Sequence, residues 1–166
     1  YLIQSAQNLA WIADMVNSGI TTYSGVWFRL TTDLDMNDIA WEPIGHNYSF
    51  CGKFDGDNHS IDNIKITNNY ENCGLWGKTG DDLMVKNLHV QINITQSNNY
   101  TAGGIIGYAL GDNMIIQNCR CTGIVRAKQI AGGIVGRIVC DSSAIIKYCC
   151  NLSEVKTSIK RTGTGG

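Results

Sequence analysis

The pattern of hydrophobic and polar positions changes character about 20 residues into the chain. Ser5 is a candidate helix N-cap, and Gly19 stands where a helix end commonly needs a left-handed residue. Between them lies an apolar stripe with helical spacing, made of Leu9, Ile12, Ala13 and Val16. Later apolar runs are short, beginning with the strand-like residues 26–30. The pattern predicts one N-terminal helix followed by β structure.

From about residue 44 the chain repeats two short motifs in alternation. The first is rich in small residues and occurs at residues 51–54, 73–77, 103–107 and 132–136. The second has an apolar residue on each side of a polar pair, and it occurs at residues 61–64, 85–88, 116–119 and 146–149. Aligning the second motifs on Asn63, Asn87, Asn118 and Tyr148 gives steps of 24, 31 and 30 residues. Two markers with similar periods indicate a true internal repeat.

A period of this length with such short strands favours a parallel β-solenoid. Helix-pair repeats need longer apolar runs, and a propeller blade of the WD type needs about 40 residues. We therefore predict an all-β chain of about four coils, with the helix as a cap over one end. Equivalent residues on successive coils stack about 4.8 Å apart. Two inward ladders are expected: Ile64, Leu88, Cys119 and Cys149 in one, and Leu75, Ile105 and Ile134 in the other.

These motifs divide the chain into three parts. Residues 1–40 are expected to form the cap with its helix and first strands, residues 41–155 the repeats, and residues 156–166 a tail or linker. The chain begins with Tyr1, which we interpret as the start of a mature or excised segment. No run reaches the roughly 18 apolar residues of a membrane span.

Composition supports this picture and narrows the partners. Gly, Asn and Ile are 19, 16 and 21 of 166 residues, a combination typical of short buried strands joined by tight turns. Charged residues are 16%, against roughly 25% in ordinary soluble domains, and the net charge is −1. A nucleic-acid partner is therefore not expected.

Seven cysteines in a chain of this size indicate an oxidising compartment. Cys51 and Cys73 fall at the same place in adjacent motifs, which predicts a separation within the roughly 4.4–6.8 Å that a disulfide needs. Cys121 and Cys150 are a second candidate pair, one residue out of register. Cys140 has no repeat partner and is expected to be the unpaired thiol.

Cys119 and Cys149 lie on a predicted apolar ladder. They form either a stack of small buried side chains or a disulfide, and the sequence leaves both open. The cysteines lack the spacing of a zinc site, so no metal is expected.

Five Asn-x-Ser/Thr tripeptides exceed the about two that composition predicts. They are candidate N-glycosylation sites if the chain is secreted by a eukaryote, and ordinary turn residues if it is bacterial. They begin at Asn47, Asn58, Asn93, Asn99 and Asn151.

Asp55, Asp57 and His59 are the best candidates for acid–base chemistry, since some sugar-cleaving β-helices carry carboxylates on one sheet. Asp-Gly and Asp-Asn are also ordinary turn pairs, and no Glu stands at the spacing of a calcium loop. Asp33 and Asp35 are no better candidates for catalysis. We therefore expect no catalytic residues, no cofactor and no metal.

The order of motifs resembles the GLUG repeat family of bacterial surface proteins, which includes the IgA-specific metallopeptidases. The name-giving segment appears as Gly74-Leu75-Trp76-Gly77 and again at residues 104–107 and 133–136. Trp41-Glu42-Pro43-Ile44-Gly45 and residues 54–61 match the upstream signature. The resemblance covers roughly residues 5–155, and it implies a right-handed parallel β-helix on a cell surface or secreted, with no catalytic residues. The cysteine content departs from the family pattern.

These observations lead to one expected function with two alternatives. The first is a non-enzymatic extracellular or cell-surface module that acts as an adhesive or structural scaffold, with a surface glycan or protein as partner. A self-assembling subunit of an extracellular, glycosylated filament is the alternative, in which copies of the chain bind one another through open solenoid ends. A polysaccharide-active enzyme is the third.

Overall fold

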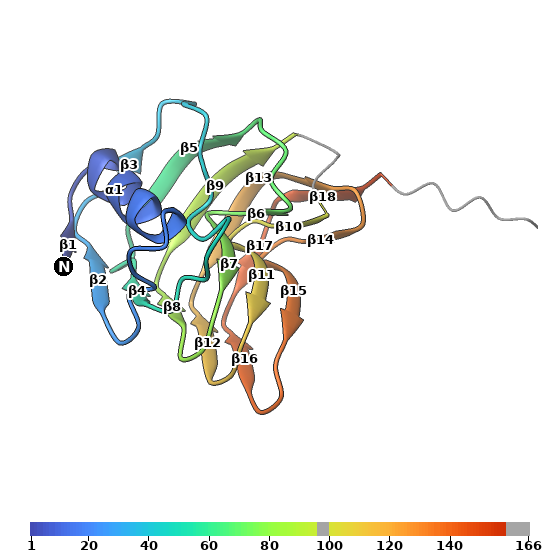
Figure 1. Ribbon diagram of the computed structural model, residues 1–166. Coiled ribbons are helices and arrows are strands. Elements are labelled where there is room, and N and C mark those ends of the chain that lie inside the picture. The colour runs from blue at the N-terminus through green and yellow to red at the C-terminus, as the bar shows by residue number, and fades with distance from the viewer. Residues whose placement is uncertain (96–99, 159–166) are drawn as a thin grey trace, which may run out of the picture.

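The computed structural model describes residues 1–95 and 100–158, which form one helix and a stack of short parallel strands (Figure 1). Helix α1 (Ala6–Asn17) begins after Ser5, whose side chain accepts a hydrogen bond from the Asn8 backbone N–H, as predicted. At 12 residues it is too short to cross a membrane, and it is the only helix in the part of the chain that the structure describes.

The strands form two six-stranded sheets and two three-stranded sheets, and all the pairings between them are parallel. Sheet A consists of β1 (Leu2–Ile3), β2 (Trp27–Leu30), β4 (Lys53–Asp55), β8 (Met84–Lys86), β12 (Met114–Gln117) and β16 (Ala144–Lys147). Sheet B consists of β3 (Leu34–Asp35), β5 (Ser60–Ile66), β9 (His89–Ile94) and β13 (Arg120–Ala127), with β17 (Cys150–Asn151) and β18 (Glu154–Thr157) both paired to β13. Sheet C consists of β7 (Trp76–Thr79), β11 (Ile106–Leu110) and β15 (Val135–Val139), and sheet D of β6 (Asn72–Cys73), β10 (Thr101–Gly103) and β14 (Ile130–Gly132).

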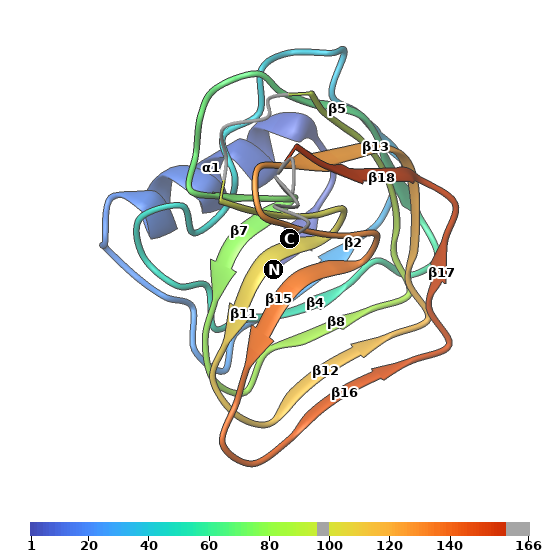
Figure 2. The same ribbon diagram turned by 90° about the vertical axis from the view of Figure 1, so that its right-hand side faces the viewer.

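Each coil of the chain visits sheets C, A, B and D in turn before it returns to C one level further along the stack (Figure 2). The result is a parallel β-solenoid of about five turns. The predicted fold class is therefore confirmed, although the expected four coils were one too few. The difference arises because β1, β2 and β3 of the expected cap already belong to sheets A and B.

The register corrects the first step of the sequence alignment. Asn87 stacks on Gly56 of the preceding coil, because Asp55 pairs with Lys86. The alignment of Asn63 with Asn87 was wrong, since a step of 24 residues is shorter than one full turn. Ile64 stacks on Ile92 instead of Leu88.

The later steps of the alignment are confirmed. Leu88, Cys119 and Cys149 lie in one ladder, in which the Arg120 N–H donates to the Leu88 carbonyl and the Cys150 N–H to the Cys119 carbonyl. Leu75, Ile105 and Ile134 form the second ladder through the same kind of bonds.

The corner between sheets A and B is built from left-handed residues on successive coils. Asn87, Asn118 and Tyr148 have φ of 54°, 50° and 55°, a region that Asn tolerates better than other side chains. The Asn118 Nδ2 donates to Asn87 Oδ1 at 2.8 Å, and the Asn87 Nδ2 donates to Asp55 Oδ1 at 3.0 Å. Side-chain bonds therefore run along the stack and reinforce the backbone pairing.

Helix α1 lies at the N-terminal end of the stack (Figure 1). Leu9, Ile12 and Val16 are fully buried, and they belong to the same core as Phe28 and Leu30 of β2. The helix therefore covers the first inward-facing side chains of the core, while β1 and β3 are the outer strands of sheets A and B at this end.

Candidate functional site

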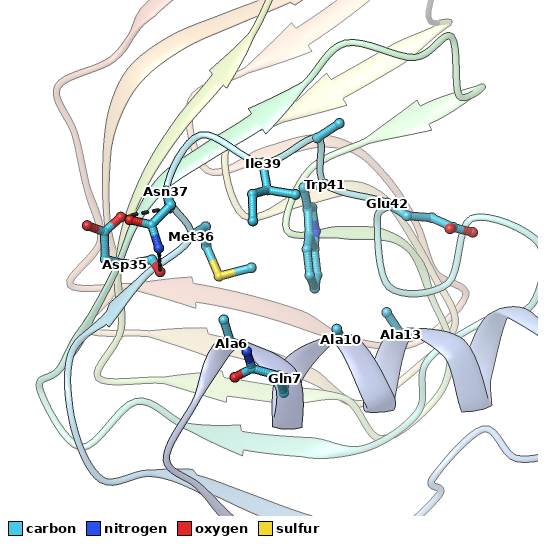
Figure 3. Close-up of a pocket in the computed structure, with 11 residues that line it drawn as sticks. Ala6, Gln7, Ala10, Ala13, Asp35, Met36, Asn37, Ile39, Trp41 and Glu42 are labelled. Atoms are coloured by element: carbon cyan, nitrogen blue, oxygen red, sulfur yellow. Dashed lines mark hydrogen bonds between the residues drawn. The ribbon is translucent and has the colours of Figure 1, made fainter.

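A groove of about 320 Å³ lies between α1 and the segment that links β3 to residue 42 (Figure 3). Its helix side is formed by three alanines, Ala6, Ala10 and Ala13, together with Gln7. Its opposite wall is formed by Met36, Ile39 and Trp41. Asp35 and Glu42 stand at its two ends (Figure 3).

The helix side is open because its residues are small. The large apolar side chains of α1 turn into the solenoid core, while the alanines form the neighbouring face. In Figure 3 the alanines face the side chains of Met36 and Trp41 across the groove. The groove therefore exists because the helix residues that line it are small.

The opposite wall is held by hydrogen bonds to sheet B and to the next coil. The Met36 N–H donates to the Asp62 carbonyl at 2.9 Å, and the Trp41 N–H donates to the Lys65 carbonyl at 2.7 Å. The indole Nε1 of Trp41 donates to the Leu75 carbonyl at 3.2 Å. Trp41 is thus buried and fixed, whereas Ile39 at the rim is 69% exposed.

Each end of the groove carries an acid with its own partners. Asp35 Oδ1 accepts from Asn63 Nδ2 at 2.9 Å and from the Asn37 N–H at 2.8 Å, and these bonds lower the pKa of the Asp35 carboxyl below its ordinary value. Glu42 Oε1 accepts from Asn17 Nδ2 at 3.2 Å and lies 2.9 Å from His46 Nδ1. Because the floor between the two acids is mainly apolar, the groove suits a ligand that has an apolar side chain with a cationic group on each side.

The sequence did not point to this groove. It named Trp41 only as part of the family signature, and it considered Asp35 only for catalysis. The available signal was the series of alanines beside the apolar stripe of the helix, which leaves room for a second surface.

No disulfide joins any two of the seven cysteines, all of which lie within the described residues. The predicted Cys51–Cys73 pair is wrong, because Phe50 pairs with Thr79 while Cys73 pairs with Ala102. Cys51 therefore stacks near Gly80 and not on Cys73, from which a full face of the solenoid separates it.

The other cysteines lie where the repeat places them. Cys119 is buried over half-buried Cys149, and Cys121 pairs with Asn151 while Cys150 pairs with Arg120, one residue out of register. Burial raises the pKa of both the Cys119 and Cys121 thiols to about 12. Cys140 is exposed.

Four of the five candidate glycosylation sites lie within the described residues, and Asn99 lies outside them. Asn58 is exposed at a left-handed turn, and Asn93 is half-buried on β9. Asn47 and Asn151 are exposed but engaged: Asn47 Nδ2 donates to the Asn17 carbonyl, and Asn151 Oδ1 accepts from the Ser153 N–H at 3.1 Å. Their occupancy stays a prediction.

The carboxylates considered for catalysis all hold structural partners. Asp57 forms an ion pair of 2.6 Å with Arg29. Asp55 forms one of 3.0 Å with Lys86; burial alone would raise the pKa of Asp55, but its bonds to Lys86 and Asn87 bring it below the ordinary value.

His59 and Asp33 form a separate pair. His59 Nδ1 lies 3.0 Å from Asp33 Oδ1, which also accepts from the Ser60 N–H, and these bonds lower the pKa of Asp33. These acids thus lie at strand ends or on the turns between strands, where they bond to neighbouring coils.

Among residues 1–95 and 100–158, no three His, Cys, Asp or Glu side chains gather in a way that would hold a metal ion.

Comparison with known proteins gives one sequence relative. The chain is 27% identical over 139 residues to halomucin of Haloquadratum walsbyi; the match covers 72% of this chain and spans only 2% of that protein. A crystal structure of a candidate immunoglobulin A1 protease from Bacteroides ovatus is 21% identical with a TM-score of 0.44, covering 92% of this chain and 66% of that one. No protein-family model matches the chain.

Proposed function

We propose that this chain is a non-enzymatic module of a surface or secreted protein, a GLUG-type solenoid that serves as an adhesive scaffold. The groove beside α1 is its contact site, and it takes a short protein segment with an apolar side chain between basic residues. The observation that carries the proposal is the combination of an apolar floor with an acid at each end.

Three features support this choice. The solenoid presents an extended, rigid surface, which suits contact with other macromolecules. The relative is named a mucin, and mucin-like proteins belong to surfaces, so the surface setting extends to this chain as part of the proposal. The wall of the groove is fixed by main-chain bonds, so a ligand is not required to order it.

A protein segment fits the groove better than a glycan does. Met36, Ile39 and the alanines offer apolar contacts, and the buried indole of Trp41 already uses its N–H within the fold. Sugar rings need several hydrogen-bonding groups beside a flat aromatic face, whereas the lining here is mainly apolar, with Gln7 on the helix side and the acids at the two ends.

The test is a binding screen against a displayed peptide library and a glycan array, with two matched variants. Ala10→Lys places a long cationic side chain in the groove and should raise the dissociation constant of captured peptides at least tenfold, which corresponds to about 1.4 kcal/mol. Gln4→Lys adds the same charge at an exposed position outside the groove and should leave binding unchanged.

Capture of glycans alone, or peptide binding that Ala10→Lys does not weaken, would reject the groove as the contact site. Selected peptides without basic residues would reject the role of Asp35 and Glu42.

A further inference from the structure

An exposed tryptophan stands on the outer face of sheet A, whose strands lie side by side in Figure 2. Trp27 is 43% exposed, whereas the next residue, Phe28, faces the core and is fully buried. Strand β2, which carries both, pairs with β1 on one side and with β4 on the other. Trp27 is therefore exposed on the face of the sheet, and its exposure does not depend on how either end of the stack continues.

Two lysines from neighbouring strands contact the indole ring of Trp27. Lys53 is the register partner of Trp27 on β4, and its Nζ lies 5.8 Å from the ring centroid. Lys86 lies on β8, one strand further, and its Nζ lies 5.3 Å from a ring centroid of the same indole. The two side chains thus meet the ring over β4, and each contact is worth about 0.5–1 kcal/mol at an exposed site. A ring held in this way loses little conformational freedom when a ligand stacks on it.

The charges on this face favour an acidic ligand. On β2, β4 and β8 the outward-facing charged side chains are three cations, Arg29, Lys53 and Lys86, and one acid, Asp55. Asp55 binds Lys86 at 3.0 Å, and Arg29 is paired with Asp57 of the adjoining turn. In the part of the chain that the structure describes, no carboxylate forms an ion pair with Lys53. Lys53 can therefore receive a negatively charged group beside the exposed ring.

A hollow of about 250 Å³ adjoins Lys53 on the same face. It follows the outward column of Lys53 onto the next two coils, where Met84 pairs with Lys53 and Ile115 pairs with Met84. Its lining also includes three polar side chains: Ser24, Asp82 and Asn113. Hydroxyl, carboxylate and amide groups together offer both donors and acceptors, so the hollow suits a ligand rich in hydroxyl groups.

We propose that the outer face of sheet A around Trp27 binds an acidic sugar chain, whose negative charge is a carboxylate or a sulfate. One sugar ring stacks on the indole, its anionic group pairs with Lys53, and the hydroxyl groups of a neighbouring sugar enter the hollow. A nucleic acid is a poorer fit, because it needs a line of cations and the chain has a net charge of −1. The proposal does not rest on what the α1 groove binds.

Fluorescence anisotropy with labelled oligosaccharides of equal length tests this proposal. The probes are an oligogalacturonate, which carries carboxylates, a sulfated heparin fragment, and a neutral dextran oligomer. The native chain should bind one or both acidic probes about tenfold or more tighter than the neutral probe. The two acidic arms show which anionic group the site takes.

Substitutions on the face should weaken the bound acidic probe. Trp27→Ala should weaken it about tenfold or more, and Trp27→Phe, which keeps a flat ring, should weaken it less. Lys53→Gln should weaken it and reduce the salt dependence of binding. The matched controls are Trp11→Ala, which removes an exposed ring of α1, and Lys65→Gln, which removes an exposed charge of sheet B. Both controls should leave binding unchanged. So should the groove variant Ala10→Lys, which separates a failure of the groove from a failure of this site.

Thermal unfolding of each variant shows that the fold is intact. Equal affinity for the acidic and neutral probes would overturn the proposal, and so would the absence of binding to both acidic probes. Acidic-probe binding that Trp27→Ala and Lys53→Gln leave unchanged would also overturn it. A labelled oligothymidylate is the last arm: if it binds more tightly than both acidic oligosaccharides, the face is a nucleic-acid site and the proposal is wrong.

Discussion

The repeated glycines set the spacing between coils, and Gly104 gives the sharpest test of that role. A Cβ at Gly104 would lie 2.4 Å from the carbonyl oxygen of Gly133 on the next coil and 2.0 Å from Cys121 Sγ. Real Cβ atoms essentially never approach other atoms within about 3.0 Å, so Gly104→Ala must separate the coils or displace the strand. The backbone of Gly133 cannot rotate away as a side chain can.

Overpacking of this kind costs about 1–3 kcal/mol, and the backbone contact places Gly104→Ala near the upper end. The urea dependence of unfolding for a small protein is about 1–3 kcal/mol per molar, so the urea midpoint should fall by about 1 M or more. Urea unfolding followed by circular dichroism measures this shift.

Gly80→Ala is the matched control. Its added Cβ would lie 2.6 Å from the Sγ of Cys51, and a side-chain sulfur can move aside. We expect a loss below about 1 kcal/mol, because the neighbour is flexible. A Cys121→Ala background should not rescue Gly104→Ala, since the Gly133 carbonyl remains. If Cys121→Ala fully restored the stability of Gly104→Ala, or if Gly104→Ala and Gly80→Ala lost equal stability, backbone contacts would not be what sets the spacing between coils.

Three further predictions follow from burial and charge. Ile92→Ala empties a fully buried position between Ile64 and Gly123, and it should lower the unfolding free energy by about 2–5 kcal/mol in the same urea assay; a loss below about 1 kcal/mol would contradict the core ladder. In the folded chain at pH 8, a thiol reagent should label exposed Cys140 quickly and Cys119 and Cys121 only after unfolding, because burial raises the pKa of the latter two to about 12; equal rates would contradict their burial. The pKa of Asp112 is lowered by the Ser142 and Asp141 N–H groups, so its stabilisation is present above the unfolded carboxyl pKa and is lost as the pH falls through the folded value. Asp112→Ala should therefore reduce the loss of stability on acidification, and an unchanged pH profile would count against these bonds.

The sequence predicted the parts of the fold that local patterns encode. Leu9, Ile12 and Val16 predicted the helix, because one apolar stripe with helical spacing has few other interpretations. The later coils were aligned correctly, since Asn118 and Tyr148 recur at the period of a full turn.

The first coil was misaligned because two different corners carry similar motifs. Cys51-Gly52 resembles Cys73-Gly74, yet Gly52 precedes sheet A and Gly74 follows sheet D. The two motifs can be told apart only by their places along a full turn of the solenoid. Their spacing, which is shorter than one turn, was the sign that they do not stack.

The groove was not predictable for a related reason. Its walls come from two segments that no repeat motif connects, and its shape depends on how α1 packs on the first coil. Ala10 in a sequence is an ordinary helix residue, and Ile39 is an ordinary loop residue. They become a site only when the bonds of Trp41 fix the distance between them.

Mapping a captured peptide by two-dimensional NMR tests the central claim most directly. The proposal predicts chemical-shift changes concentrated at Ala10, Ala13, Ile39 and the indole N–H of Trp41 when the tightest-binding library peptide is added. Changes confined to the turn around Asp55 and Asp57, or spread along the sheets without any in the groove, would contradict it.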